Sequence, residues 1–131
     1  RTLGCLGVER AWVVRGEDGL DEVSPCGPTR VSCLDQGRVS ELRLSPADFG
    51  LSESPPSAIA GGSAVDNAHA IQSVLAGAGH PARDAFVLNA AAALVVFEGI
   101  EPLRAAERAR EALVSGRALA LLERWRREAR A

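Results

Sequence analysis

The feature that most constrains the fold is an apolar stretch that runs from Ala85 to Phe97 with one polar interruption, Asn89. Pro81 and Gly99 bracket it where a helix typically begins and ends. Its apolar residues occupy nearly all sides of a helix, which is typical of a helix buried on most faces or lying at a subunit contact. The stretch is shorter than the roughly 18–20 apolar residues that a membrane span needs. We therefore expect it to form the core of a soluble domain.

Asn89 is the polar exception in this helix, and two roles are open to it. A buried amide must find hydrogen-bond partners, because leaving it without them costs roughly 1–3 kcal/mol. Asn89 either points at a ligand or ties down the backbone of a neighbouring loop. We expect the structural role.

Three further segments carry strand patterns. Residues 10–14 are predicted to form a short buried strand around the apolar run 11–14. Residues 29–34 and 39–44 alternate β-forming side chains on either side of a turn that contains Gly37. Two strands joined by so short a turn form an antiparallel hairpin. Together with the helices that follow, the strands predict an α/β fold with a mixed sheet, in which the antiparallel hairpin precedes a helical segment.

The remaining helices are predicted at residues 64–76, 101–113 and 117–127, with a single helical turn before Gly50. Residues 102–131 contain eight arginines and four glutamates. These charges alternate at helical spacings, which indicates solvated faces with intrahelical ion pairs. With a net charge of -2 for the chain, we expect no nucleic-acid and no membrane partner.

An acidic segment, RGEDGLDEVSP at residues 15–25, follows the first predicted strand and contains Glu17, Asp18, Asp21 and Glu22. Carboxylates crowded this closely repel one another unless a cation or hydrogen-bond donors compensate. Adjacent acids in such a loop suit Mg²⁺, which is typically bound by one or two carboxylates and by substrate phosphates. Spacing alone favours a solvated turn. The position at a strand end favours a ligand site, because open α/β sheets bind ligands beyond their strand ends.

The other reactive side chains form no recognisable site. Cys5, Cys26 and Cys33 lack a C-x-x-C pair or a histidine cluster and are expected to be reduced thiols. His69 and His80 have no nucleophile and acid at recognisable spacing. No glycine-rich phosphate loop occurs, so we assign no catalytic and no cofactor-binding residue. The chain contains no Met and opens on what resembles a helix end, which we interpret as an interior segment of a longer protein.

Six blocks, in order, resemble one family along essentially the whole chain. They are LGVERAWVVRGEDGLDEVSP, GPTRV, LSPADFGL, AGG followed by DNA, GHPARDAFVLNAAAAL, and SGRAL. The blocks resemble the C-terminal portion of the anthranilate phosphoribosyltransferases. This implies that residues 1–131 are the C-terminal portion of a phosphoribosyltransferase α/β domain. The N-terminal helical domain and the phosphate-loop half would then be absent from this chain.

The resemblance also implies a function. The family transfers a phosphoribosyl group from phosphoribosyl pyrophosphate to anthranilate in tryptophan biosynthesis, in a cytoplasmic homodimer. The resemblance implies that Asp21 and Glu22 bind Mg²⁺ against the diphosphate, whereas Glu17 and Asp18 do not bind the metal. The family usually has His where this chain has Arg15, which is expected to pair with Glu17 or Asp18 or to contact pyrophosphate.

Two alternatives remain open from the sequence. In the first alternative, the chain is part of a related nucleoside phosphorylase or of another phosphoribosyltransferase. This alternative stays open because the acceptor is selected by segments that the chain lacks. Alternatively, it is a catalytically silent fragment that acts as an interaction piece. In each case the sheet is expected to be incomplete, and exposed strand edges favour association of the isolated piece.

Overall fold

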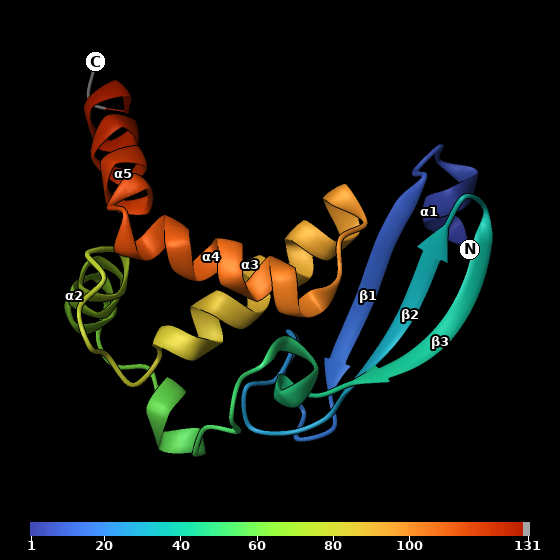
Figure 1. The fold of residues 1–131 in the computed structure, drawn as a ribbon, viewed down its shortest axis with the longest axis horizontal. Coiled ribbons are helices and arrows are strands. Elements are labelled where there is room, and N and C mark those ends of the chain that lie inside the picture. Colours follow the sequence, from blue (N-terminus) through green and yellow to red (C-terminus); the bar gives the residue numbers. More distant parts are fainter. Residues whose placement is uncertain (130–131) are drawn as a thin grey trace.

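The computed structural model describes residues 1–129. A three-stranded sheet lies at one end of the molecule, helices α2 and α5 lie at the other end, and α3 and α4 run between them (Figure 1). The predicted α/β class is confirmed.

The sheet has the order β1–β2–β3, formed by β1 (Arg10–Gly16), β2 (Thr29–Asp35) and β3 (Arg38–Leu44). Both neighbouring pairs are antiparallel, so all strand pairs within the described residues are antiparallel. The predicted hairpin is confirmed, with Gln36 and Gly37 at φ values of 46° and 79° in its turn. Two consecutive residues with positive φ are what a tight two-residue hairpin turn requires.

The two faces of the sheet have different surroundings. Trp12 and Val14 of β1 and Leu44 of β3 pack against the main hydrophobic core. The opposite face includes Arg15 and Val13, which are exposed. The sheet is therefore buried on the side of the helices and is largely open on the other side.

Short helical turns flank the sheet. Helix α1 (Thr2–Cys5) is followed by Gly7 at φ 84°, a left-handed conformation typical of a helix end. The 3₁₀ turn η1 (Pro46–Phe49) has a capping box and ends at left-handed Gly50, as predicted. A second 3₁₀ turn is η2 (Pro56–Ile59).

Four longer helices complete the chain: α2 (Ala64–Leu75), α3 (Arg83–Glu98), α4 (Pro102–Val114) and α5 (Arg117–Glu128). All four predicted helices are confirmed to within two residues at each end. The core cluster joins α3 and α4 to Phe49, the last residue of η1, and to Leu51. Ion pairs occur within α5, as its charge pattern predicted. No helix within residues 1–129 is long and apolar enough to cross a membrane.

Helix α3 is less enclosed than its composition predicted. Val87, Leu88 and Ala91 are buried, but Phe86 is 37% exposed and Phe97 is 83% exposed. One side of α3 faces α4 and the sheet, whereas the side that carries the two phenylalanines is open.

Candidate metal-binding loop

The loop that joins β1 to β2, residues 17–28, begins with a tight turn. The Gly16 N–H donates to the Leu20 carbonyl at 2.8 Å, and the Gly19 N–H donates to the Gly16 carbonyl at 3.0 Å. Gly19 has φ 99°, a conformation that glycine adopts without strain. A Cβ added to Gly16 would lie 2.3 Å from Oδ1 of Asp18. Glycines at both positions therefore allow the chain to turn directly after the strand.

Glu17, the first acid of the loop, is held by two arginines. Arg43 donates from Nε and Nη2 to the two carboxylate oxygens at 3.1 and 2.9 Å, and Arg30 donates from Nε at 3.4 Å. The hydrogen bond from Arg43 is the main reason why the pKa of Glu17 is lowered. Because Arg30 and Arg43 lie directly opposite each other in the sheet, the carboxylate offsets their repulsion. Glu17 therefore has a structural role.

Asp18 is bound within the loop. Its Oδ2 accepts from the Ser24 hydroxyl at 2.5 Å and its Oδ1 accepts from the Leu20 N–H at 3.2 Å. The Ser24 hydrogen bond is the main cause of the lowered pKa of Asp18. Ser24 is fully buried; its N–H donates to Oγ1 of Thr29 at 2.8 Å, and its Oγ accepts from the Cys26 N–H at 3.0 Å. Asp18 is thus part of a hydrogen-bonded network that shapes the loop.

Asn89 fixes the middle of the loop from helix α3. The Val23 N–H donates to Oδ1 of Asn89 at 3.0 Å, and Nδ2 of Asn89 donates back to the Val23 carbonyl at 3.0 Å. Nδ2 also lies 3.2 Å from the Ala85 carbonyl. The prediction that Asn89 ties down a neighbouring backbone loop is confirmed. The clamp holds the residue that directly follows Glu22.

Asp21 and Glu22 have different surroundings from the other two acids. Both are exposed, and neither forms a hydrogen bond or ion pair within residues 1–129. The backbone is anchored on both sides of them, at Leu20 through Gly16 and at Val23 through Asn89. Their carboxylate oxygens are therefore free to bind a cation, although their role as metal ligands remains a prediction.

The donor set narrows the kind of cation that fits. No group of three or more His, Cys, Asp or Glu side chains in the described part of the chain is arranged to hold a metal. Zn²⁺ and Ca²⁺ typically require more protein ligands than two carboxylates. Mg²⁺ keeps several waters and is often held by one or two carboxylates together with substrate phosphate oxygens. The pair Asp21 and Glu22 fits Mg²⁺ in that mode.

Arg15 does not form the pairs that were considered for it. It is exposed, lies directly opposite Arg30 in the sheet, and forms no ion pair with Glu17 or Asp18. The sequence reasoning missed Arg30 and Arg43 as the partners of Glu17. The register of the predicted hairpin, which sets Arg30 opposite Arg43, was the available signal.

The remaining candidates are accounted for by local structure. The three cysteines are free, and burial raises the pKa of the Cys26 thiol, which keeps it protonated. Nδ1 of His80 accepts from the Ala82 N–H at 3.1 Å at the start of α3.

An apolar hollow of about 750 Å³ lies between α3 and α4, and neither Asp21 nor Glu22 lines it. Asp21 and Glu22 are therefore separate from this apolar hollow.

Comparison with known proteins links the chain to one family. The family described as "Glycosyl transferase family, a/b domain" matches residues 1–119. The anthranilate phosphoribosyltransferase of Methylobacterium radiotolerans is 45% identical over 125 residues, which cover 95% of this chain and 36% of the relative. That of Myxococcus xanthus is 48% identical over 120 residues, covering 90% and 36%. The chain thus spans a little over a third of the length of these relatives.

Solved structures agree with the sequence comparison. The crystal structure of anthranilate phosphoribosyltransferase from Thermus thermophilus has a TM-score of 0.86 and 35% identity, covering 98% of this chain and 38% of that one. The enzyme from Saccharomyces cerevisiae in complex with PRPP and Mg has a TM-score of 0.78 and 33% identity, covering 87% and 33%.

Proposed function

Because the chain belongs to this glycosyl transferase family, we propose that residues 1–131 are the C-terminal portion of the α/β domain of an anthranilate phosphoribosyltransferase. The N-terminal helical domain and the phosphate-loop half would belong to the longer protein. That protein would be a cytoplasmic, homodimeric pentosyltransferase of tryptophan biosynthesis. It would transfer the phosphoribosyl group of phosphoribosyl pyrophosphate to the amine of anthranilate and release pyrophosphate. The similarity to such enzymes along nearly the whole chain supports this proposal.

In this proposal Asp21 and Glu22 hold Mg²⁺ against the diphosphate of the substrate. When bound, the metal supplies positive charge that offsets the negative charge developing on the departing pyrophosphate. Carboxylates repel a diphosphate, so these side chains need a cation between them and the substrate. Asn89 and the network around Ser24 keep the two carboxylates in place without occupying their oxygens.

One observation carries the metal assignment: the loop uses two of its four acids for its own structure and leaves the other two free. Glu17 and Asp18 are bound by Arg43 and Ser24, whereas Asp21 and Glu22 are bound by nothing in the described chain. A solvated acidic turn would not need anchors on both sides of one adjacent pair.

The test uses a chimera in which this chain replaces the matching 38% of the Thermus thermophilus relative. Asp21→Asn combined with Glu22→Gln is expected to lower turnover about a hundredfold or more, equivalent to at least about 2.7 kcal/mol of transition-state stabilisation. The Mg²⁺ concentration for half-maximal rate is expected to rise. Titration calorimetry with Mg²⁺ and phosphoribosyl pyrophosphate measures the loss of binding directly.

Glu17→Gln is the matched control in the same loop and is expected to change turnover less than fivefold, because its carboxylate is already held by Arg43. Equal losses for the control and the double variant would reject Asp21 and Glu22 as the specific metal ligands. Unchanged affinity and turnover in the double variant would reject the metal site altogether.

A further inference from the structure

The open face of the sheet carries a row of three arginines, one from each strand. Arg15 of β1 lies directly opposite Arg30 of β2, and Arg30 lies directly opposite Arg43 of β3. Residues directly opposite each other in antiparallel strands share one face of the sheet, with Cβ atoms roughly 4.5–5.5 Å apart. All three arginines are exposed. Three positive charges therefore extend from adjacent strands on one surface.

Carboxylates compensate these three charges unequally. Glu17 accepts from Nε and Nη2 of Arg43 at 3.1 and 2.9 Å, which engages both of its carboxylate oxygens. Arg30 reaches Glu17 only through Nε at 3.4 Å, and its side chain is 77% exposed. Arg15 forms no ion pair within residues 1–129. Arg15 and Arg30 thus share at most one carboxylate, which Arg43 already holds.

The other carboxylate on this face does not compensate Arg15 or Arg30. Glu41 lies opposite Ser32 in the next row of the sheet and accepts from its hydroxyl at 2.6 Å. In the described part of the chain Glu41 forms no ion pair with an arginine. Like charges directly opposite each other destabilise a sheet, so the pair Arg15 and Arg30 favours an external anion.

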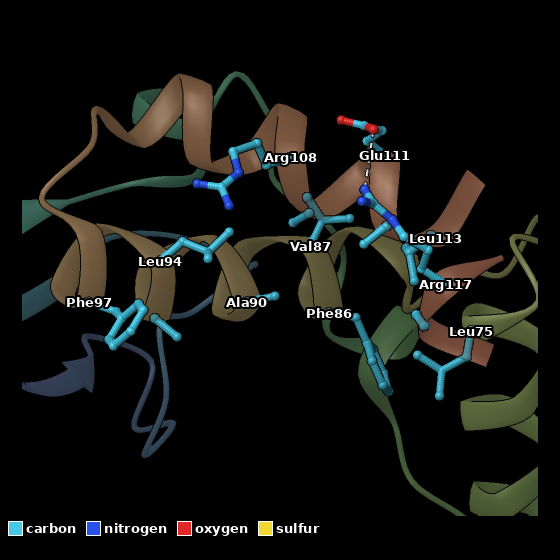
Figure 2. Close-up of a pocket in the computed structure, with 14 residues that line it drawn as sticks. Leu75, Phe86, Val87, Ala90, Leu94, Phe97, Arg108, Glu111, Leu113 and Arg117 are labelled. Atoms are coloured by element: carbon cyan, nitrogen blue, oxygen red, sulfur yellow. Dashed lines mark hydrogen bonds and ion pairs between the residues drawn. The ribbon is translucent and has the colours of Figure 1, made fainter. Parts of the chain in front are cut away.

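Arginines on the helices show the contrast. Figure 2 shows such an arginine beside its carboxylate, with Nη2 of Arg117 at 3.2 Å from Oε1 of Glu111. Arg108 of α4 pairs in the same way with Glu98 of α3. These guanidinium groups have a carboxylate of their own within the fold, whereas Arg15 has none in residues 1–129.

We propose that Arg15 and Arg30 bind a terminal phosphate group, carried by inorganic phosphate or by a phosphomonoester. The two side chains extend from directly opposed positions, so both guanidinium groups can donate to the oxygens of one tetrahedral group. Guanidinium is planar and presents its donors as a fork that matches phosphate geometry. The charge of a phosphate dianion offsets that of the two guanidinium groups. Arg43 stays with Glu17, which limits the site to one phosphate group.

This site differs from the metal-binding loop in how it holds phosphate. Asp21 and Glu22 need a cation between their carboxylates and a phosphate, whereas arginines donate to phosphate oxygens directly. The phosphate site on the sheet therefore requires no metal and does not rest on the proposed transferase reaction. It does share Arg30 with Glu17, so the bound phosphate competes with that carboxylate for one guanidinium group.

The test titrates the ¹⁵N-labelled chain with inorganic phosphate in the presence of EDTA, with sodium chloride adjusted to keep the ionic strength constant. The Nε–H signals of Arg15 and Arg30 are expected to shift and to saturate together, because both groups contact the same anion. The signal of Arg104, an exposed arginine on α4, is expected to stay in place. Melting temperatures of the chimera with and without phosphate make the test independent of any association of the isolated chain.

Four substitutions separate this site from a general attraction of anions. Arg15→Gln is expected to weaken phosphate binding at least about tenfold, because it removes charge-assisted hydrogen bonds. Arg15→Lys keeps the charge but not the fork, so a smaller loss of about threefold is expected. Glu17→Gln removes the competing carboxylate and is expected to tighten binding about twofold. Arg104→Gln, the matched control for the loss of one charge, is expected to change the affinity less than about twofold.

The outcomes decide both the site and the source of the phosphate. Tighter binding of inorganic phosphate than of glycerol 3-phosphate would assign the site to free phosphate, and the reverse order would assign it to a phosphomonoester. The absence of a saturable shift up to about 50 mM phosphate, well above weak millimolar affinity, would overturn the proposal. Equal losses for Arg15→Gln and Arg104→Gln would also overturn it, since they would show a diffuse counterion effect.

This proposal and the metal assignment fail separately. The double variant of Asp21 and Glu22 is expected to bind phosphate in EDTA as the parent chain does, whatever happens to its turnover in the chimera. Loss of phosphate binding in that double variant would show that the anion is bound at the loop and not on the sheet, and would overturn the assignment to Arg15 and Arg30.

Discussion

The two acid pairs of the β1–β2 loop, Glu17 with Asp18 and Asp21 with Glu22, lie within six positions of one another and differ in almost every physical respect. The first pair accepts hydrogen bonds from Arg43, Arg30, Ser24 and the backbone, and both of its pKa values are lowered. The second pair has no partner within residues 1–129. Proximity in sequence therefore says little about whether a carboxylate builds a loop or is free to bind a ligand.

The two acid pairs differ because different residues lie beside the loop at each pair. Glu17 is still beside the sheet, where Arg30 and Arg43 meet, and Asp18 turns inward onto buried Ser24. Asp21 and Glu22 lie between two anchored residues, and both are exposed. The comparison predicts that stability is sensitive to the anchors and to the first pair, and insensitive to the second pair.

The largest effect on stability is expected from Asn89→Ala. The substitution leaves the N–H and the carbonyl of Val23 without partners, and Val23 is only 2% exposed. Each buried group left unpaired costs about 1–3 kcal/mol, so the loss of both is expected to lower the free energy of unfolding by about 2–6 kcal/mol. Urea unfolding followed by circular dichroism, at one fixed protein concentration, measures this loss.

Gln72→Ala provides the control for Asn89→Ala, because Gln72 is an exposed amide on α2. It is expected to change the free energy of unfolding by no more than about 0.5 kcal/mol. Similar losses for both variants would show that Asn89 is not the anchor of the loop.

The local structure of this chain is predictable from its sequence to a large extent, because caps and glycines fix the ends of the elements. Ser63 begins α2 with a capping box, and Gly50 and Gly99 end their helical turns in the left-handed conformation. The hairpin follows from its turn. Each of these signals acts over only a few residues.

The construction of the candidate site is less predictable, because it depends on contacts between distant residues. Glu17 and Arg43 are 26 positions apart, and Val23 and Asn89 are 66 apart. The need of Asn89 for partners could be predicted from its apolar helix, but the identity of Val23 could not. The exposure of Phe97 was also unpredictable, because composition does not say which side of an apolar helix the rest of the chain covers.

An intermediate effect is expected from the Ser24–Asp18 hydrogen bond. Ser24→Ala removes a fully buried hydroxyl that also accepts from Cys26, and it is expected to cost about 1–2 kcal/mol. Because the pKa of Asp18 is lowered by folding, its contribution to stability is present above the unfolded pKa of about 3.9 and is lost as the pH falls through the lower, folded pKa.

Urea unfolding of the parent chain and of Asp18→Asn at pH 7 and pH 3 measures that contribution. The parent is expected to be more stable than Asp18→Asn at pH 7, and the difference is expected to shrink at pH 3. A difference that does not depend on pH would mean that the carboxylate charge of Asp18 contributes nothing to folding.

The smallest effects are expected from single charge changes at the exposed carboxylates, and they compare the two pairs directly. Glu17→Gln leaves Arg30 and Arg43 facing each other without their shared carboxylate, so the urea midpoint is expected to fall slightly. That fall is expected to disappear in 1 M NaCl, where the Debye length is about 3 Å. Asp21→Asn removes a charge that has no partner and sits beside Glu22, so the midpoint is expected to stay constant or rise. If Asp21→Asn lowered the midpoint more than Glu17→Gln, Asp21 would be part of the loop's own structure, and the reason for assigning it to a cation would be lost.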